Sequence, residues 1–173
     1  MQWLKRFFSL PAIAAAMLTF CCTTAGAMTE ADKFVGAWRL VSAEYRSDDG
    51  ALIESPFGAE PEGMLMYDSF GNMSVQIAGK NRQRFAASDR LAGTGDEIKS
   101  AFESYTAYFG RYSVDERERE VTHSVRQSLF PNHAAAELRR FYNFADRKLT
   151  LRTPPFLLGG KTVTGVLLWD KIR

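Results

Sequence analysis

The sequence predicts an all-β fold, a barrel of eight antiparallel strands in up-and-down order with one amphipathic helix inserted between the third and fourth strands. Short segments of strand-like alternation recur along most of the chain, and turn signals separate them. One segment departs from this pattern with helical spacing. Eight antiparallel strands must also hide their edges, which closure into a barrel achieves. A sandwich of two sheets is the alternative architecture.

The first 27 residues have the order of a secretory signal peptide. Lys5 and Arg6 supply the charged start, an apolar stretch covers residues 7–20, and small residues end at Ala27. The apolar stretch is shorter than the roughly 20 residues that span a bilayer. We therefore expect cleavage near Ala27, a mature domain over residues 28–173, and a periplasmic or secreted protein with no stable membrane span. An uncleaved anchor and a lipoprotein lipidated at a cysteine are the alternatives.

Loss of the signal changes the composition of the working protein. The full chain has 22 Lys and Arg against 20 Asp and Glu, a formal charge of +2. Because the signal holds Lys5 and Arg6 and no acidic residue, the mature domain is formally neutral. Both cysteines, Cys21 and Cys22, also lie in the signal. We therefore expect no nucleic-acid partner, no disulfide and no thiol chemistry.

Turn signals divide the mature chain into its expected strands. A short helical turn over residues 29–35 precedes the first strand, and a loop rich in proline and glycine over 51–62 follows it. The expected strands cover residues 38–45, 64–67, 72–77, 111–114, 120–130, 137–144, 148–152 and 163–172.

The helix is expected to begin at a capping box, Thr94-Gly-Asp-Glu97. Gly110 marks its expected C-terminal stop, which gives a helix of about 14 residues with an aromatic face. This face would line the mouth of a pocket as a lid, or seal the barrel as ordinary core. Its apolar residues are Ile98, Ala101, Phe102, Tyr105, Tyr108 and Phe109.

Six motifs lie in order along residues 34–173, and each is short. They are Gly36-Ala-Trp-Arg-Leu-Val41, Tyr67 with Gly71-Asn-Met-Ser-Val75, Arg84-Phe-Ala-Ala-Ser-Asp-Arg-Leu-Ala-Gly93, Tyr108-Phe-Gly-Arg-Tyr112, Val121-Thr-His-Ser-Val125 and Ser128-Leu-Phe-Pro-Asn132. Together they resemble the bacterial and fungal lipocalin-like domain family, and the first is similar to the Gly-x-Trp opening of lipocalins.

The resemblance implies a lipocalin-type β-barrel with a helix over one end, and it carries no assigned activity with it. In true lipocalins an arginine near the C-terminus packs across the tryptophan at the closed end of the barrel. Arg173 or Lys171 would take that place on Trp38. The family often has a tryptophan after Pro-Asn, where this chain has His133.

Two basic side chains are the leading candidates for a site inside the barrel. His123 shares a strand face with Val121 and Val125, which predicts that it points inward. It would serve as an acid or base near neutral pH, or as a core histidine held by hydrogen bonds. Arg140 would bind a carboxylate or enolate through its planar guanidinium group. A reversed face or a bulge would instead direct Arg139 inward.

The other candidates follow from their neighbours. Glu44 shares a face with Trp38 and would be the counter-charge inside the barrel, or would be exposed. Arg84 belongs to a basic run, residues 80–84, which would be a solvated loop or would meet an anionic group at the barrel mouth. The candidate ligand-binding residues are His123, Arg140, Tyr67, Phe102, Tyr105, Phe109 and Arg84. No catalytic set, metal site or cofactor is expected, because the two histidines lack zinc-binding spacing and no nucleophile motif occurs.

These observations favour an exported lipocalin-like protein that binds a small hydrophobic or amphipathic molecule and is not an enzyme. The alternative is an isomerase or cyclase that acts on a bound polyketide-like substrate, with His123 and Arg140 as acid/base and anion stabiliser. A third hypothesis is a protein-binding barrel whose rim loops, 79–95 and 131–136, contact a partner. The volume and lining of the interior distinguish these functions. The sequence leaves open the identity of the ligand and the oligomeric state.

Overall fold

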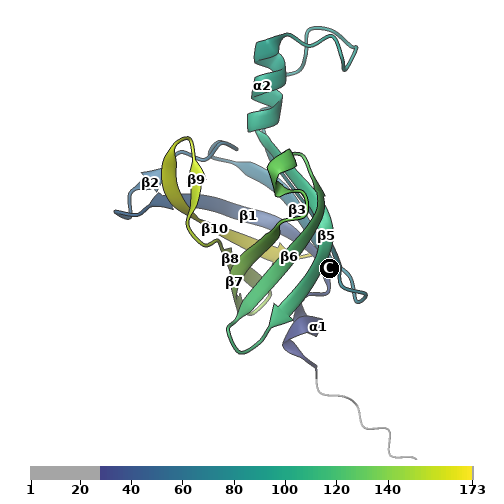
Figure 1. Cartoon of the computed structure of the whole chain (residues 1–173), viewed down its shortest axis with the longest axis vertical. Coiled ribbons are helices and arrows are strands. Elements are labelled where there is room, and N and C mark those ends of the chain that lie inside the picture. The colour runs from purple at the N-terminus through teal and green to yellow at the C-terminus, as the bar shows by residue number, and fades with distance from the viewer. Residues whose placement is uncertain (1–27, 173) are drawn as a thin grey trace, which may run out of the picture.

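The structure, a computed structural model, describes residues 28–172, so the expected signal peptide and Arg173 lie outside the described residues. Eight strands of five or more residues form an antiparallel sheet in which each pairs with the next, and the first and last pair to close it (Figure 1). This confirms the eight-stranded barrel and excludes the sandwich. The strands are β1 (Gly36–Ser47), β3 (Pro61–Tyr67), β4 (Asn72–Gly79), β5 (Tyr105–Asp115), β6 (Glu120–Ser128), β7 (Glu137–Ala145), β8 (Lys148–Arg152) and β10 (Lys161–Lys171).

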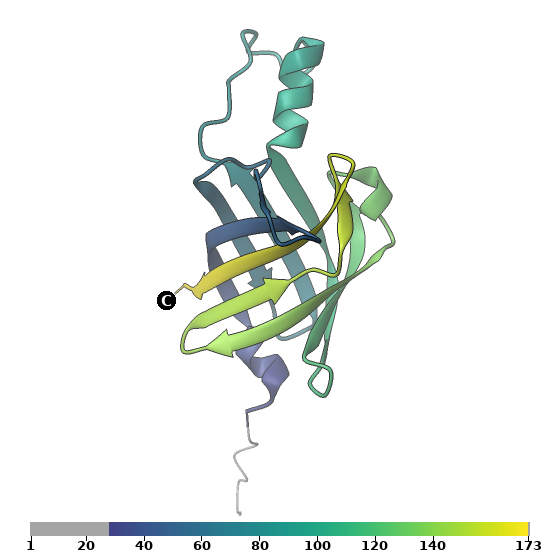
Figure 2. The same ribbon diagram turned by 90° about the vertical axis from the view of Figure 1, so that its left-hand side faces the viewer.

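Short elements decorate the two ends of the barrel. At one rim the short strand β2 (Leu52–Ile53) pairs with β1, and β9 (Phe156–Leu158) pairs with β10 (Figures 1 and 2). The 3-10 helix η1 (Pro131–His133) connects β6 to β7 at the same rim. The helix α1 (Glu30–Phe34) lies at the opposite end. Nowhere in residues 28–172 is a helix both long and apolar enough to cross a bilayer.

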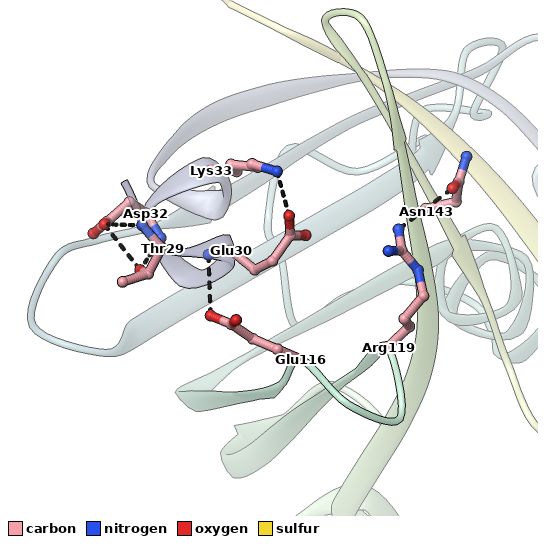
Figure 3. Close-up of polar contacts among 7 residues, drawn as sticks. All are labelled: Thr29, Glu30, Asp32, Lys33, Glu116, Arg119 and Asn143. Atoms are coloured by element: carbon pink, nitrogen blue, oxygen red, sulfur yellow. Dashed lines mark hydrogen bonds and ion pairs between the residues drawn. The ribbon is translucent and has the colours of Figure 1, made fainter. Parts of the chain in front are cut away.

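The helix α1 closes its end of the barrel with Phe34, whose side chain is completely buried against Tyr67, Tyr142 and Phe144. The Phe34 carbonyl accepts a hydrogen bond from the Trp38 indole at 2.8 Å, which fixes the helix to β1. Figure 3 shows a second attachment, in which the backbone amide of Glu30 donates to Glu116 Oε1 at 3.0 Å. This end of the barrel is therefore solid core.

Lys171 takes the place across Trp38 that the family resemblance implied for a C-terminal basic residue. Its ammonium nitrogen lies 5.0 Å from the centroid of the Trp38 ring. The same nitrogen donates a hydrogen bond to the Lys33 carbonyl at 2.9 Å. Lys171 thus joins the last strand to both the first strand and α1.

A β-bulge in β1 decides the direction of Glu44. The register shifts between Leu40 and Ser42, so one extra residue separates the two halves of the strand. Trp38 and Leu40 are buried before the bulge and Tyr45 is buried after it. Glu44 therefore faces solvent, where it pairs with Arg46 at 3.1 Å. Of the two alternatives for Glu44, an inward counter-charge or exposure, the structure shows exposure.

The helix expected to end at Gly110 is much shorter. The helix α2 (Gly95–Glu103) begins at the expected capping box, in which Thr94 and Glu97 satisfy each other's backbone amides, and ends at Ser104. Tyr105 already pairs with Ala78 as the first residue of β5. None of the residues of α2 is buried, and Figures 1 and 2 show the helix rising beyond the rim rather than lying over the opening.

Candidate functional site

The barrel encloses a cavity of about 940 Å³. Its lining includes residues of β2, β9, η1 and the α2–β5 junction, all of which lie at the rim away from α1 (Figures 1 and 2). The cavity is thus closed at the α1 end and reached from the opposite rim. Ligand sites for small molecules reach about 1,000 Å³ and are mostly apolar. The apolar part of this wall includes Leu65, Val75, Ile77, Leu138, Leu151 and Leu167.

A hydrogen-bonded chain of three side chains forms one polar part of the wall. His123 on β6 is 1% exposed. Its Nε2 lies 2.7 Å from the Tyr67 hydroxyl, and its Nδ1 lies 3.0 Å from the Tyr108 hydroxyl. Tyr67 lies on β3 and Tyr108 on β5, so the chain spans the barrel interior. His123 and Tyr108 line the cavity, whereas Tyr67 lies behind them.

Burial determines the protonation of this chain. It lowers the pKa of His123 well below the ordinary value, and the charge of Arg140 lowers that pKa further. Burial also raises the pKa of Tyr67 well above the ordinary value. At neutral pH both side chains are therefore uncharged. A neutral imidazole has one N–H donor and one acceptor nitrogen, so the two tyrosines have different roles toward it.

The pairing of β6 with β7 directs Arg140 into the barrel. Arg140 lies opposite Val121, which is completely buried, so both side chains share the inner face. Arg139 points outward and holds Glu120 through two hydrogen bonds, of 2.8 and 2.6 Å. Of these two arginines, the inner one is Arg140. Its Nη1 donates to the Arg139 carbonyl at 2.7 Å, and no carboxylate among residues 28–172 pairs with it.

Residues 35–172 match the family described as the lipocalin-like domain. The chain belongs to this family. A curated relative, the 4'-hydroxy-3'-methoxypropiophenone carrier protein of Aspergillus oryzae, is 28% identical over 107 residues. The alignment covers 58% of this chain and 96% of the relative.

The lipocalin-like domain brings four of the seven candidate ligand-binding residues to its cavity wall, namely His123, Arg140, Phe102 and Tyr105. Tyr67 contacts the cavity only through His123. Phe109 points away from the barrel with 49% of its surface exposed. Arg84 lies in the exposed loop before α2 and does not line the cavity. Phe109 faces outward because it alternates with Tyr108 along β5, not along a helix.

Tyr108 was expected on the aromatic face of a helix at the pocket mouth, and it lines the cavity from β5 instead. Trp169 and Tyr45 also line the cavity and were not predicted. Trp169 is 1% exposed, and its indole nitrogen has no hydrogen-bond partner within the described chain. Tyr45 is buried, which raises its pKa to about 12. The alternation in the last strand favours an inward Trp169 but does not show its unpaired N–H group.

No group of three or more His, Cys, Asp and Glu side chains within residues 28–172 is placed to hold a metal ion. The cavity of the lipocalin-like domain offers a large apolar wall, a buried tyrosine–histidine–tyrosine chain and the inward Arg140. Such a wall binds apolar surface by the hydrophobic effect, and the few polar groups orient what binds.

Proposed function

We propose that this lipocalin-like domain binds and carries a small hydrophobic or amphipathic molecule in its barrel. The observation that carries this proposal is the open cavity of about 940 Å³ with its largely apolar wall. The carrier function in the name of the Aspergillus oryzae relative supports it. A cavity of this size accommodates a molecule of one or two aromatic rings with its substituents.

Binding is measured directly with a fluorescent apolar probe, N-phenyl-1-naphthylamine, whose emission rises in an apolar site. We expect saturable binding to the purified protein and displacement by 4'-hydroxy-3'-methoxypropiophenone. Leu138→Trp places an indole in the cavity wall and should weaken the binding of the probe by about tenfold, which corresponds to a steric cost of roughly 1.4 kcal/mol. Val41→Trp adds the same side chain at a position that is 44% exposed, and it should leave binding unchanged. A protein that shows no saturable binding would refute the proposal.

We also propose that the domain works outside the cytoplasm, after cleavage near Ala27. The support is the order of charged, apolar and small residues in the first 27 positions. The intact mass of the protein recovered from the periplasm or medium tests this. The expected species begins at Met28, and recovery of only the full-length chain from the cytoplasm would contradict the proposal.

A second candidate function is the isomerase or cyclase activity, and one observation favours it. His123 and Arg140 both line the same cavity, as that hypothesis requires. However, both ring nitrogens of His123 are already hydrogen-bonded to tyrosines. Within the tyrosine–histidine–tyrosine chain, Tyr108 is therefore the residue whose polar group can meet a substrate. Enolisation is the step to measure, as exchange of the protons next to the carbonyl of 4'-hydroxy-3'-methoxypropiophenone for deuterium. Protein-dependent exchange supports an enzyme, and binding without exchange supports a carrier.

A further inference from the structure

Tyr67 fixes the direction of the hydrogen bonds in the tyrosine–histidine–tyrosine chain. Its side chain is 2% exposed, and within the described residues its hydroxyl has one partner, Nε2 of His123. A buried O–H group without an acceptor is costly, so Tyr67 must donate its proton to Nε2. Nε2 is then the acceptor of the neutral ring, and the ring proton is on Nδ1.

The ring proton in turn orients Tyr108. The Nδ1–H group of His123 donates to the Tyr108 oxygen at 3.0 Å. The Tyr108 hydroxyl has no other partner in the part of the chain that the structure describes, and the residue lines the cavity. Its own O–H therefore points to the cavity as a donor. Because its oxygen already accepts a hydrogen bond, the O–H is polarised and donates more strongly.

Arg140 adds more donors on the same cavity. A guanidinium group has five N–H donors and no acceptor, and one of its nitrogens binds the Arg139 carbonyl. The carboxylates on the wall are Glu54, Glu103 and Glu137, and all three are exposed to solvent. The buried polar wall therefore offers donors and positive charge without a balancing anion.

We propose that the cavity selects amphipathic molecules whose buried polar end is an accepting oxygen, a carbonyl, carboxylate or phenolate, held by Tyr108 and Arg140. This inference rests on the proposed function and specifies the ligand class of the same site. Ligands whose buried end is an ammonium group are disfavoured, because Arg140 repels a second cation there.

Four naphthalenes with different substituents test the selection by displacing N-phenyl-1-naphthylamine. They are 2-ethylnaphthalene, 2-acetonaphthone, 2-naphthoate and 2-(aminomethyl)naphthalene. Tyr108→Phe should weaken the binding of the ketone and the carboxylate by about tenfold, which corresponds to one hydrogen bond at the upper end of its usual range. The affinity for 2-ethylnaphthalene should not change. Arg140→Gln should weaken 2-naphthoate by more than tenfold and strengthen the ammonium ligand. Arg126→Gln, which removes an exposed charge from the outer face of β6, is the matched control.

The outcomes separate this inference from the proposed function. If N-phenyl-1-naphthylamine does not bind the wild-type protein, the proposed function fails and the inference fails with it. If the probe binds but Tyr108→Phe and Arg140→Gln change all four ligands equally, the carrier function stands and the selection is refuted. Loss confined to the ligands with accepting oxygens supports the inference.

The tautomer of the His123 ring provides a second test, which uses the wild-type protein and needs no substitution. The chain has two histidines, so labelling them with ¹⁵N gives few signals to assign. The nitrogen shifts of His123 in the wild-type protein distinguish the two tautomers. We expect the proton on Nδ1, and a proton on Nε2 would overturn the donor orientation of Tyr108.

Discussion

Loss of the Tyr67 hydroxyl should destabilise the protein by more than the usual worth of a hydrogen bond. Tyr67→Phe leaves Nε2 of His123 without a partner in a side chain that is 1% exposed. An unpaired buried group costs about 1–3 kcal/mol, because water cannot replace the lost partner. Tyr112→Phe removes a hydroxyl that donates to the Asp68 carbonyl at a half-buried site, and it should cost about 0.5–1.5 kcal/mol.

A double-mutant cycle isolates the hydrogen bond itself. His123→Leu alone leaves the Tyr67 hydroxyl buried and unpaired, whereas the combination with Tyr67→Phe leaves two apolar side chains that need no partner. The double variant should therefore be more stable than the sum of the single losses by about 1–2 kcal/mol. Urea unfolding at pH 7.5 measures each value, and the slope with urea should not change. Losses that add to within about 0.5 kcal/mol would refute the reasoning.

Burial lowers the pKa of His123 below its ordinary value of 6.5, so the unfolded chain takes up a proton below that pH while the folded ring stays neutral. The free energy of unfolding should fall as the pH drops below about 6.5, and His123→Gln should reduce this fall in urea titrations at each pH. Gly110→Ala would place a methyl group 2.1 Å from the Ser124 carbonyl oxygen and should cost at least about 1–3 kcal/mol in thermal unfolding; an unchanged midpoint would contradict the β5–β6 geometry. Lys171→Met removes the ammonium group over Trp38 and should lower the free energy of unfolding by about 1 kcal/mol, measured by circular dichroism melting. An unchanged stability would contradict a stabilising contact between Lys171 and Trp38.

The strand pattern and its closure could be predicted because they follow from alternation and from the need to hide edges. Val121, His123 and Val125 alternate without interruption, and all three are buried as expected. The bulge in β1 could not be predicted, because an extra residue changes the face of every residue that follows it and leaves no mark in the composition. The face of Glu44 therefore stayed open between the barrel interior and solvent until the register with β10 was known.

The end of α2 was misplaced because two periodicities agree over a short segment. Phe102, Tyr105 and Phe109 fit helical spacing, but Tyr105 and Phe109 are also two members of a strand rich in aromatic residues. Pairing with β4 decides between them, since Tyr105 gains a partner strand that the sequence does not reveal. Phe102 and Tyr105 still line the cavity, because a strand that starts at Tyr105 also begins at the barrel rim.

The sequence left the direction of Arg139 and Arg140 open, and only the partner strand resolves it. Their order along β7 is compatible with either face. The register with β6 places Arg140 opposite a buried valine and Arg139 beside Glu120. On the other side of β6, the packing of β5 brings the Tyr108 hydroxyl to His123, a contact between strands that local spacing does not contain.

The pairing of β1 with β10 also sets the order of events in folding. Trp38 lies opposite Lys171, so the contact that closes the barrel joins residues close to the two ends of the described chain. Such distant contacts form slowly, because the ends of a long loop must first meet. During synthesis the growing sheet has two open edges, and it cannot close until β10 has been made. A chain that still lacks β10 therefore exposes two sheet edges that can pair with other chains, and the synthesis of β10 ends this exposure.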